Sequence, residues 1–98
     1  MLLTKKDIAK LDEAAEIFKA FGNPIRIRII DALQERNLRV MELAKLLDYP
    51  QPIISQQLKI LRGAGVVKKV MEERSYHYAL TNPHYSFMVK CMKDCLSL

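Results

Sequence analysis

The segment 51–65 constrains the fold more than any other part of the chain. Pro52 is tolerated only in the first turn of a helix, so a helix through this segment must begin near residue 51. Apolar residues then recur at intervals of four and three, as on one side of a helix: Ile54, Leu58 and Leu61. Gly65 suits the left-handed conformation that commonly follows a helix C-terminus. The sequence therefore predicts a short helix over 51–63 that is buried along one side.

Apolar periodicity and turn residues place the other elements around this helix. Helices are expected over about 4–20, 24–35, 39–47 and 83–96, and a hairpin is expected to pair 66–70 with 76–80 around a tip at 71–75. The predicted fold is mainly α with a small β-hairpin, in the order ααααββα. We expect a single domain, 1–98, because no linker long enough to divide the chain is present.

The run 25–30 also fits a strand, because isoleucine and arginine alternate in it. Two observations favour a helix instead. Asn23 is a good N-cap with proline at the first helical position behind it, and Ile27, Ile30 and Leu33 have helical spacing. On such a helix Arg26 and Arg28 point in nearly opposite directions, so they cannot form one basic patch.

Composition indicates a small globular domain. Half of the 98 residues are apolar, enough for one compact core, and two cysteines are too few for a disulfide framework. No apolar run approaches the roughly 18 residues of a membrane span, and the charged segment 4–7 does not fit a secretory signal. We therefore expect a cytoplasmic protein with no membrane partner. In a domain this small, contacts with a partner should add stability.

The net charge of +5 favours a polyanionic partner, and part of the surplus lies in 51–80. Two short helices joined by a tight turn and followed by a hairpin form a winged helix-turn-helix, whose second helix fits the major groove of DNA. The polar side of the helix 51–63 supplies the candidate DNA-binding residues Gln51, Ser55, Gln56, Gln57, Lys59 and Arg62. Glutamine can pair with adenine through two hydrogen bonds, whereas lysine and arginine suit phosphates. A merely solvated helix surface is the alternative.

The hairpin tip adds one candidate DNA contact. Arg74 is expected to enter a neighbouring groove or to hold a phosphate, whereas Glu72 and Glu73 oppose DNA. A plain surface turn is the alternative for this segment.

Five motifs in order resemble the ArsR/SmtB family of bacterial transcriptional repressors. They are Gly22-Asn23-Pro24-Ile25-Arg26-Ile27-Arg28-Ile29-Ile30, Met41-Glu42-Leu43-Ala44, Ser55-Gln56-Gln57-Leu58-Lys59-Ile60-Leu61, Ala64-Gly65-Val66-Val67 and Tyr76-His77-Tyr78-Ala79-Leu80. The resemblance runs without gaps from about residue 8 to 96. It implies a homodimer joined through its first and last helices, which binds a two-fold DNA operator and is released by a ligand. Gln57 stands where the family often has histidine, and Pro50 where it has a capping serine, which leaves the base preference open.

The resemblance also implies two places for a metal ion. Arg39 and Met41 occupy the positions of the family's Cys-x-Cys pair, and arginine cannot ligate a cation, so we expect no site there. The family's site on the last helix corresponds here to Asn82, His84, Cys95 and Leu98, of which His84 and Cys95 are good zinc ligands.

Helical spacing separately groups His84, Met88, Cys91 and Cys95 on one side of the last helix. His84 and Cys95 lie ~16 Å apart along the helix axis, too far to share an ion within one chain. An antiparallel partner helix could bring them together. The candidate metal ligands are therefore His84, Cys91 and Cys95, for zinc, cadmium or arsenite. Thiol oxidation, or a role as small interface side chains, are the alternatives.

The leading functional hypothesis is a sequence-specific DNA-binding repressor of its own or a neighbouring operon. A winged-helix module that binds protein and not DNA is the alternative, against which the amide-rich face and the basic segment speak. We do not expect an enzyme. His84 and Cys91 lie ~10 Å apart along a helix, beyond the ~3 Å of a hydrogen bond between nucleophile and base.

Overall fold

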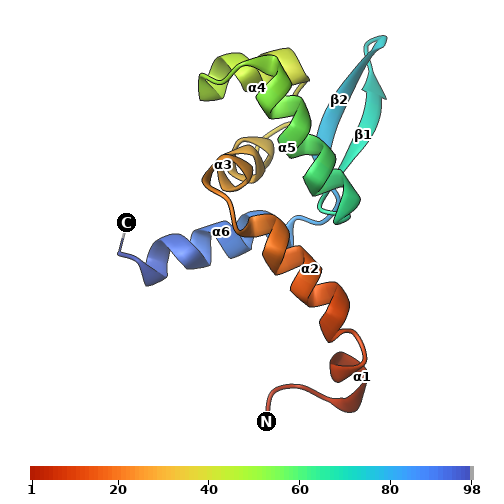
Figure 1. Ribbon diagram of the computed structural model, residues 1–98, viewed down its shortest axis with the longest axis vertical. Helices are drawn as coiled ribbons and strands as arrows, with labels where there is room; N and C mark the ends of the chain where they lie inside the picture. The colour runs from red at the N-terminus through yellow and green to blue at the C-terminus, as the bar shows by residue number, and fades with distance from the viewer. Residues whose placement is uncertain (98) are drawn as a thin grey trace.

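The computed structural model describes residues 1–97 as six helices and one antiparallel hairpin (Figure 1). The elements are α1 (Lys5–Ile8), α2 (Leu11–Phe21), α3 (Pro24–Leu33), α4 (Val40–Leu47), α5 (Gln51–Gly63), β1 (Val67–Glu72), β2 (Ser75–Leu80) and α6 (His84–Cys95). Helices α3, α4 and α5 and the hairpin form a head, from which α2 and α6 extend as two arms (Figure 1). Among the described residues, no helix combines the length and apolar character needed to cross a lipid bilayer. The mainly α winged helix-turn-helix fold is confirmed.

Helix α3 forms where alternation suggested a strand. The side-chain oxygen of Asn23 accepts hydrogen bonds from the backbone N–H groups of Ile25 (2.9 Å) and Arg26 (3.2 Å), and Pro24 takes the first helical position. This cap satisfies two of the N–H groups that a helix leaves unpaired at its start. The helix then buries its far half: Ile29, Ile30 and Leu33.

The single helix predicted over 4–20 is wrong, because two helices occupy that segment. Thr4 and Asp7 form a reciprocal capping box, with distances of 2.8 and 3.2 Å, that closes the one turn of α1. At Lys10 the backbone turns to φ −107° and ψ 10°, and α2 starts at Leu11. No glycine or proline marks this break, so apolar spacing gave no sign of it.

The hairpin has longer strands and a tighter tip than predicted. Val67 pairs with Leu80 and Glu72 with Ser75, which leaves a two-residue turn. Glu73 and Arg74 both have positive φ (49° and 65°), as in the turns whose twist matches that of a hairpin. Those turns favour Asn-Gly, so Glu-Arg gave no signal for them.

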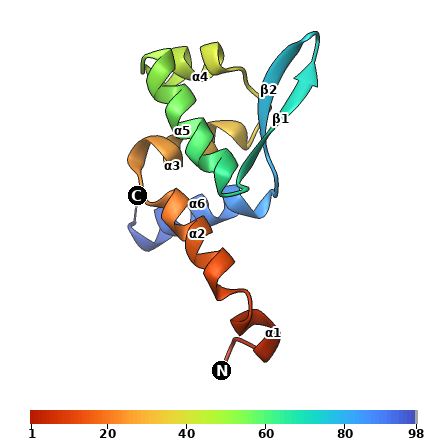
Figure 2. The same cartoon turned by 45° about the vertical axis from the view of Figure 1, so that its right-hand side comes forward.

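The segment between α3 and α4 anchors the hairpin to the head. The side-chain amide of Asn37 donates to the Glu72 carboxylate at 2.5 Å. Leu38 and Tyr78 exchange two backbone hydrogen bonds, at 3.1 and 2.7 Å. Figure 2 shows the hairpin following directly from the C-terminal end of α5, so it is tied to the head at two places.

The core lies in the head. Its fully covered side chains come from α3, α4, α5, β1 and the segments between them: Ile29, Ile30, Leu38, Leu43, Ile54, Leu58, Leu61, Val66 and Val67. The stripe predicted for the helix 51–63 is confirmed, because its three residues have no exposed surface. These contacts fix which side of α5 faces outward.

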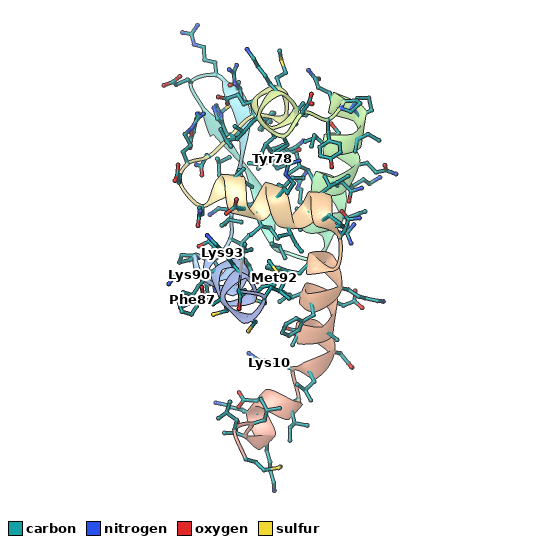
Figure 3. All side chains as sticks on the ribbon, turned by 90° about the vertical axis from the view of Figure 1, so that its left-hand side faces the viewer. Lys10, Tyr78, Phe87, Lys90, Met92 and Lys93 are labelled. Carbon is teal, nitrogen blue, oxygen red and sulfur yellow. The ribbon has the colours of Figure 1, made fainter. Side chains whose placement is uncertain are left out.

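The arms leave much of their apolar surface uncovered. In α2 only Ala20 is buried, and α6 has no buried residue. At the end of α2, Phe21 packs against the core as a partly buried side chain, whereas Phe18, one turn earlier, is 65% exposed. Met92 lies on the side of α6 that faces α2, and Phe87 and Lys90 lie on the opposite side (Figure 3). The radius of gyration, 14.4 Å, exceeds the roughly 13 Å of a compact chain of this length, as extended arms require.

Candidate nucleic-acid interface

The outer side of α5 carries the predicted polar residues. Gln51, Ser55, Gln56, Lys59 and Arg62 are exposed, and Gln57 is half-buried at the edge of this surface. We call these six residues the α5 face. The structure thus brings all six predicted residues together on one helix. This geometry suits a helix that enters a groove, because amides and a hydroxyl stand near its start and cations near its end.

The turn before α5 has no side-chain cap, and backbone geometry sets it instead. Asp48 ends α4 in the left-handed conformation (φ 59°). Pro50 then accepts hydrogen bonds through its carbonyl from Ile53 (3.0 Å) and Ile54 (3.2 Å) as α5 begins. The angle between the two helices therefore depends on these few residues.

Arg28 of α3 contacts both sides of the turn between α4 and α5. The guanidinium of Arg28 donates to the Leu47 carbonyl at 3.1 Å, and lies 5.7 Å from the centre of the Tyr49 ring. Leu47 ends α4, where carbonyls lack helical partners, so this bond satisfies one of them. Arg28 therefore fixes the two-helix unit and is not part of the α5 face.

Arg26 leaves α3 in another direction and reaches the α5 face. Its guanidinium donates to the side-chain oxygen of Gln57 at 2.8 Å, and to the backbone carbonyls of Ala20 (2.7 Å) and Lys19 (3.3 Å). The prediction that Arg26 and Arg28 cannot form one patch is confirmed. The contact between Arg26 and Gln57 could not be predicted from local sequence patterns, because the two residues lie 31 positions apart.

Of the two acidic side chains near the hairpin tip, that of Glu72 points toward the segment between α3 and α4 and not toward the tip. The Glu72 carboxylate is held by Asn37, toward the segment between α3 and α4. Lys69 lies over the rings of Tyr76 (5.3 Å) and Tyr78 (5.9 Å). Arg74 is exposed at the tip, which projects beyond the helices (Figure 1). The tip therefore presents Arg74, as predicted, together with an exposed Glu73.

At the start of α4, one carboxylate pairs with two arginines. Glu42 pairs with Arg39 at 3.2 Å and with Arg36 at 3.3 Å. Hydrogen bonds from the Arg39 backbone and side chain lower the pKa of Glu42 to about 2. The carboxylate is thus charged at neutral pH, and it neutralises the Arg39 side chain that stands where a metal ligand would be needed.

The residues predicted for a metal site do not form one within a single chain. His84, Cys91 and Cys95 are exposed, and both thiols are free. In residues 1–97, no three histidine, cysteine or acidic side chains lie close enough to hold a metal ion. The side-chain oxygen of Asn82 accepts from the His84 backbone N–H at 2.9 Å, and so helps to start α6. Leu98 lies outside the described residues.

One partly exposed apolar residue of α5 was not among the predicted site residues. Ile60 is 43% exposed, and lines a shallow hollow of about 300 Å³ with Glu16, Lys19, Ala20 and Arg26. Its spacing placed it neither with the buried stripe nor among the polar residues. The hollow separates the α5 face from the end of α2.

Comparison with known proteins agrees with this geometry. The model of the family "Bacterial regulatory protein, arsR family" matches residues 23–69, which run from the cap of α3 into β1. The transcriptional repressor SmtB of Mycobacterium tuberculosis is 42% identical over 79 residues, covering 81% of this chain. The chain spans 58% of the length of that relative. A transcriptional regulator of Methanocaldococcus jannaschii, MJ1325, is 37% identical over 86 residues, 87% of this chain and 97% of that protein.

Solved structures give the same result. The transcriptional repressor BigR from Xylella fastidiosa superimposes with a TM-score of 0.80 at 28% identity, over 95% of this chain and 96% of that one. A homodimeric winged helix-turn-helix domain from Mycobacterium bovis superimposes with a TM-score of 0.81 at 21% identity, over 98% and 89% of the two chains, and supports the fold alone. The chain therefore belongs to the ArsR family of winged helix-turn-helix transcriptional regulators.

Proposed function

We propose that this chain is a sequence-specific transcriptional repressor that binds a two-fold DNA operator as a homodimer, in the cytoplasm. The α5 face is the observation that carries the proposal, because its polar side chains stand clear of a core that fixes their direction. In this proposal Gln51, Ser55, Gln56 and Gln57 lie toward the bases, and Lys59, Arg62 and Arg74 toward phosphates. The proposal includes no catalytic step.

The arms support the homodimer. Helix α2 exposes Leu11 and Phe18, and α6 exposes Phe87; Ile8 and Leu96 are exposed just before α2 and just after α6. Between the arms lies an apolar hollow of about 180 Å³, lined by residues that include Phe18, Phe21 and Met92. A second copy would cover this surface and place the two α5 faces on the same side of one duplex.

Salt dependence of DNA binding tests the proposal. Each chain offers three cations to phosphates, so a dimer that uses all six should show a slope of log affinity against log salt of about −5. Raising the salt from 50 to 200 mM should then weaken binding roughly 10³-fold. Fluorescence anisotropy with a duplex from the chain's own promoter region measures this slope. A slope near zero would favour the alternative, a winged-helix module that binds protein.

Two substitutions on α5 should separate base reading from phosphate binding. Gln56→Ala should weaken operator binding by about 1–3 kcal/mol and leave binding to random DNA unchanged. Lys59→Ala should weaken both alike and make the salt slope shallower by about 2 per dimer. Lys90→Ala on α6 is the control, because it removes an equal charge outside the α5 face. Equal losses of discrimination in the first two variants would contradict the division of roles.

The thiols of α6 support a second part of the proposal, which concerns release from DNA. Cys91 and Cys95 are free, exposed and one helical turn apart. We propose that they and His84 of the other subunit bind a soft ion such as zinc, cadmium or arsenite. The redox alternative is that a peroxide, itself reduced to water, oxidises one of the thiols to a sulfenic acid. Metal should then be retained by the protein purified under reducing conditions, and lost in Cys91→Ser/Cys95→Ser. If neither protein binds metal and DNA affinity is equal, the soft-ion proposal fails.

A further inference from the structure

Arg26 connects two parts of the molecule that are far apart in sequence. Its guanidinium contacts the last carbonyls of α2, at Lys19 and Ala20, and the side chain of Gln57 on α5. The five donors of a guanidinium lie in one rigid plane. Once two carbonyls of α2 bind Nε and Nη2 and hold that plane, the direction of the third nitrogen, Nη1, toward Gln57 is set.

The contact also fixes which end of the Gln57 amide faces outward. Arginine donates hydrogen bonds and accepts none, so the oxygen of the amide must face Arg26. Its NH₂ group is then the end that points away from Arg26. A bidentate pair with adenine needs the oxygen and the nitrogen aimed at one base edge. The oxygen of Gln57 has two lone pairs, and the 2.8 Å bond to Arg26 occupies one of them. The oxygen is thereby held toward Arg26, which favours the NH₂ group as the outward contact over a bidentate pair.

We infer that Arg26 is a positioning residue that fixes Gln57 as a hydrogen-bond donor toward DNA and ties that orientation to the end of α2. This rests on the proposed function and gives Gln57 a base acceptor as its target: guanine N7 or O6, or thymine O4. Gln56, exposed and free of this contact, keeps both ends of its amide for adenine.

The hollow between α2 and α5 shows how the contact between Arg26 and Gln57 depends on the position of α2. Arg26 lines it together with Lys19 and Ala20, and Ile60 of α5 forms its other wall. Ala20 is the buried residue through which α2 enters the core. A shift of the last turn of α2 would therefore move the Arg26 plane and release the Gln57 oxygen.

A double-mutant cycle tests this inference. Anisotropy at one salt concentration gives the ratio of operator to random-DNA affinity for the natural protein, Arg26→Lys, Gln57→Ala and the double variant. Lysine keeps the charge but lacks the planar fork. Each single change should lower the ratio about 3- to 10-fold, and the double variant should lose no more than Gln57→Ala alone. Additive losses, or an unchanged ratio in Arg26→Lys, would overturn the inference.

A second variant covers the case in which Arg26→Lys does not fold. Gln57→Asn leaves Arg26 and its α2 contacts intact, but its amide is too short to reach the guanidinium. We expect it to lower the ratio as Gln57→Ala does, with an unchanged thermal unfolding midpoint. If Gln57→Asn keeps full discrimination, Arg26 only caps α2. If the natural protein itself shows no salt-dependent DNA binding, the proposed function fails, and the inference fails with it.

Discussion

Replacing Leu58 with alanine should lower the free energy of unfolding by about 3–4 kcal/mol. Leu58 has no exposed surface and lies in the middle of the α5 stripe, between Ile54 and Leu61. The substitution removes buried methyl groups and leaves a cavity that the rigid surroundings only partly fill. Because small domains have total stabilities of about 5–15 kcal/mol, this loss is a large fraction of the whole. Urea unfolding followed by circular dichroism measures it.

Ile60→Ala is the matched control for this substitution. Ile60 lies two residues further along the same helix but is 43% exposed. Its truncation removes fewer contacts, so the loss should stay near 1 kcal/mol or below. Similar losses in both variants would mean that α5 is not oriented by its stripe, and the assignment of the α5 face would fail with it.

Replacing Phe18 with glutamate should separate the proposed dimer. Phe18 is 65% exposed in one chain and lies beside the apolar hollow between α2 and α6. In a two-fold interface each substitution occurs twice, and losing an aromatic anchor costs about 2 kcal/mol or more. The dimer dissociation constant should therefore rise about 10³-fold, before the repulsion of two buried carboxylates is counted. Analytical ultracentrifugation measures this change.

Met41→Glu provides the comparison. Met41 is 63% exposed, nearly as much as Phe18, but it lies on α4 in the head. We expect this variant to remain a dimer and Phe18→Glu to lose operator binding together with dimerisation. If Met41→Glu dissociates while Phe18→Glu does not, the interface lies on the head and not on the arms.

The sequence predicted the head of the molecule well because its signals are local. Asn23-Pro24 starts α3, Pro52 fixes where α5 begins, and three aliphatic residues orient it. Each signal acts within one or two turns of helix, so no tertiary information is needed. The position of Gln51, Ser55, Gln56, Lys59 and Arg62 on the exposed side of α5 followed from the same stripe.

Features that depend on contacts across the fold could not be predicted this way. The break at Lys10 has no glycine or proline, and the apolar spacing continues through it. The arm residues look like core residues in the sequence, since an interface with a second chain follows the same periodicity as a core. The bond from Arg26 to Gln57 joins side chains whose neighbourhood only the packing of α3 against α5 creates.

The most direct measurement is the change in backbone amide NMR shifts as the labelled protein binds a duplex selected from random sequence. If α5 enters the groove, the largest changes should fall on Ser55, Gln56 and Lys59, with smaller ones at Arg74. Residues on the outer side of α6, such as Phe87 and Lys90, should stay unchanged. Large shifts on Met41 and Lys45 of α4 with none along α5 would contradict the claim that α5 reads DNA.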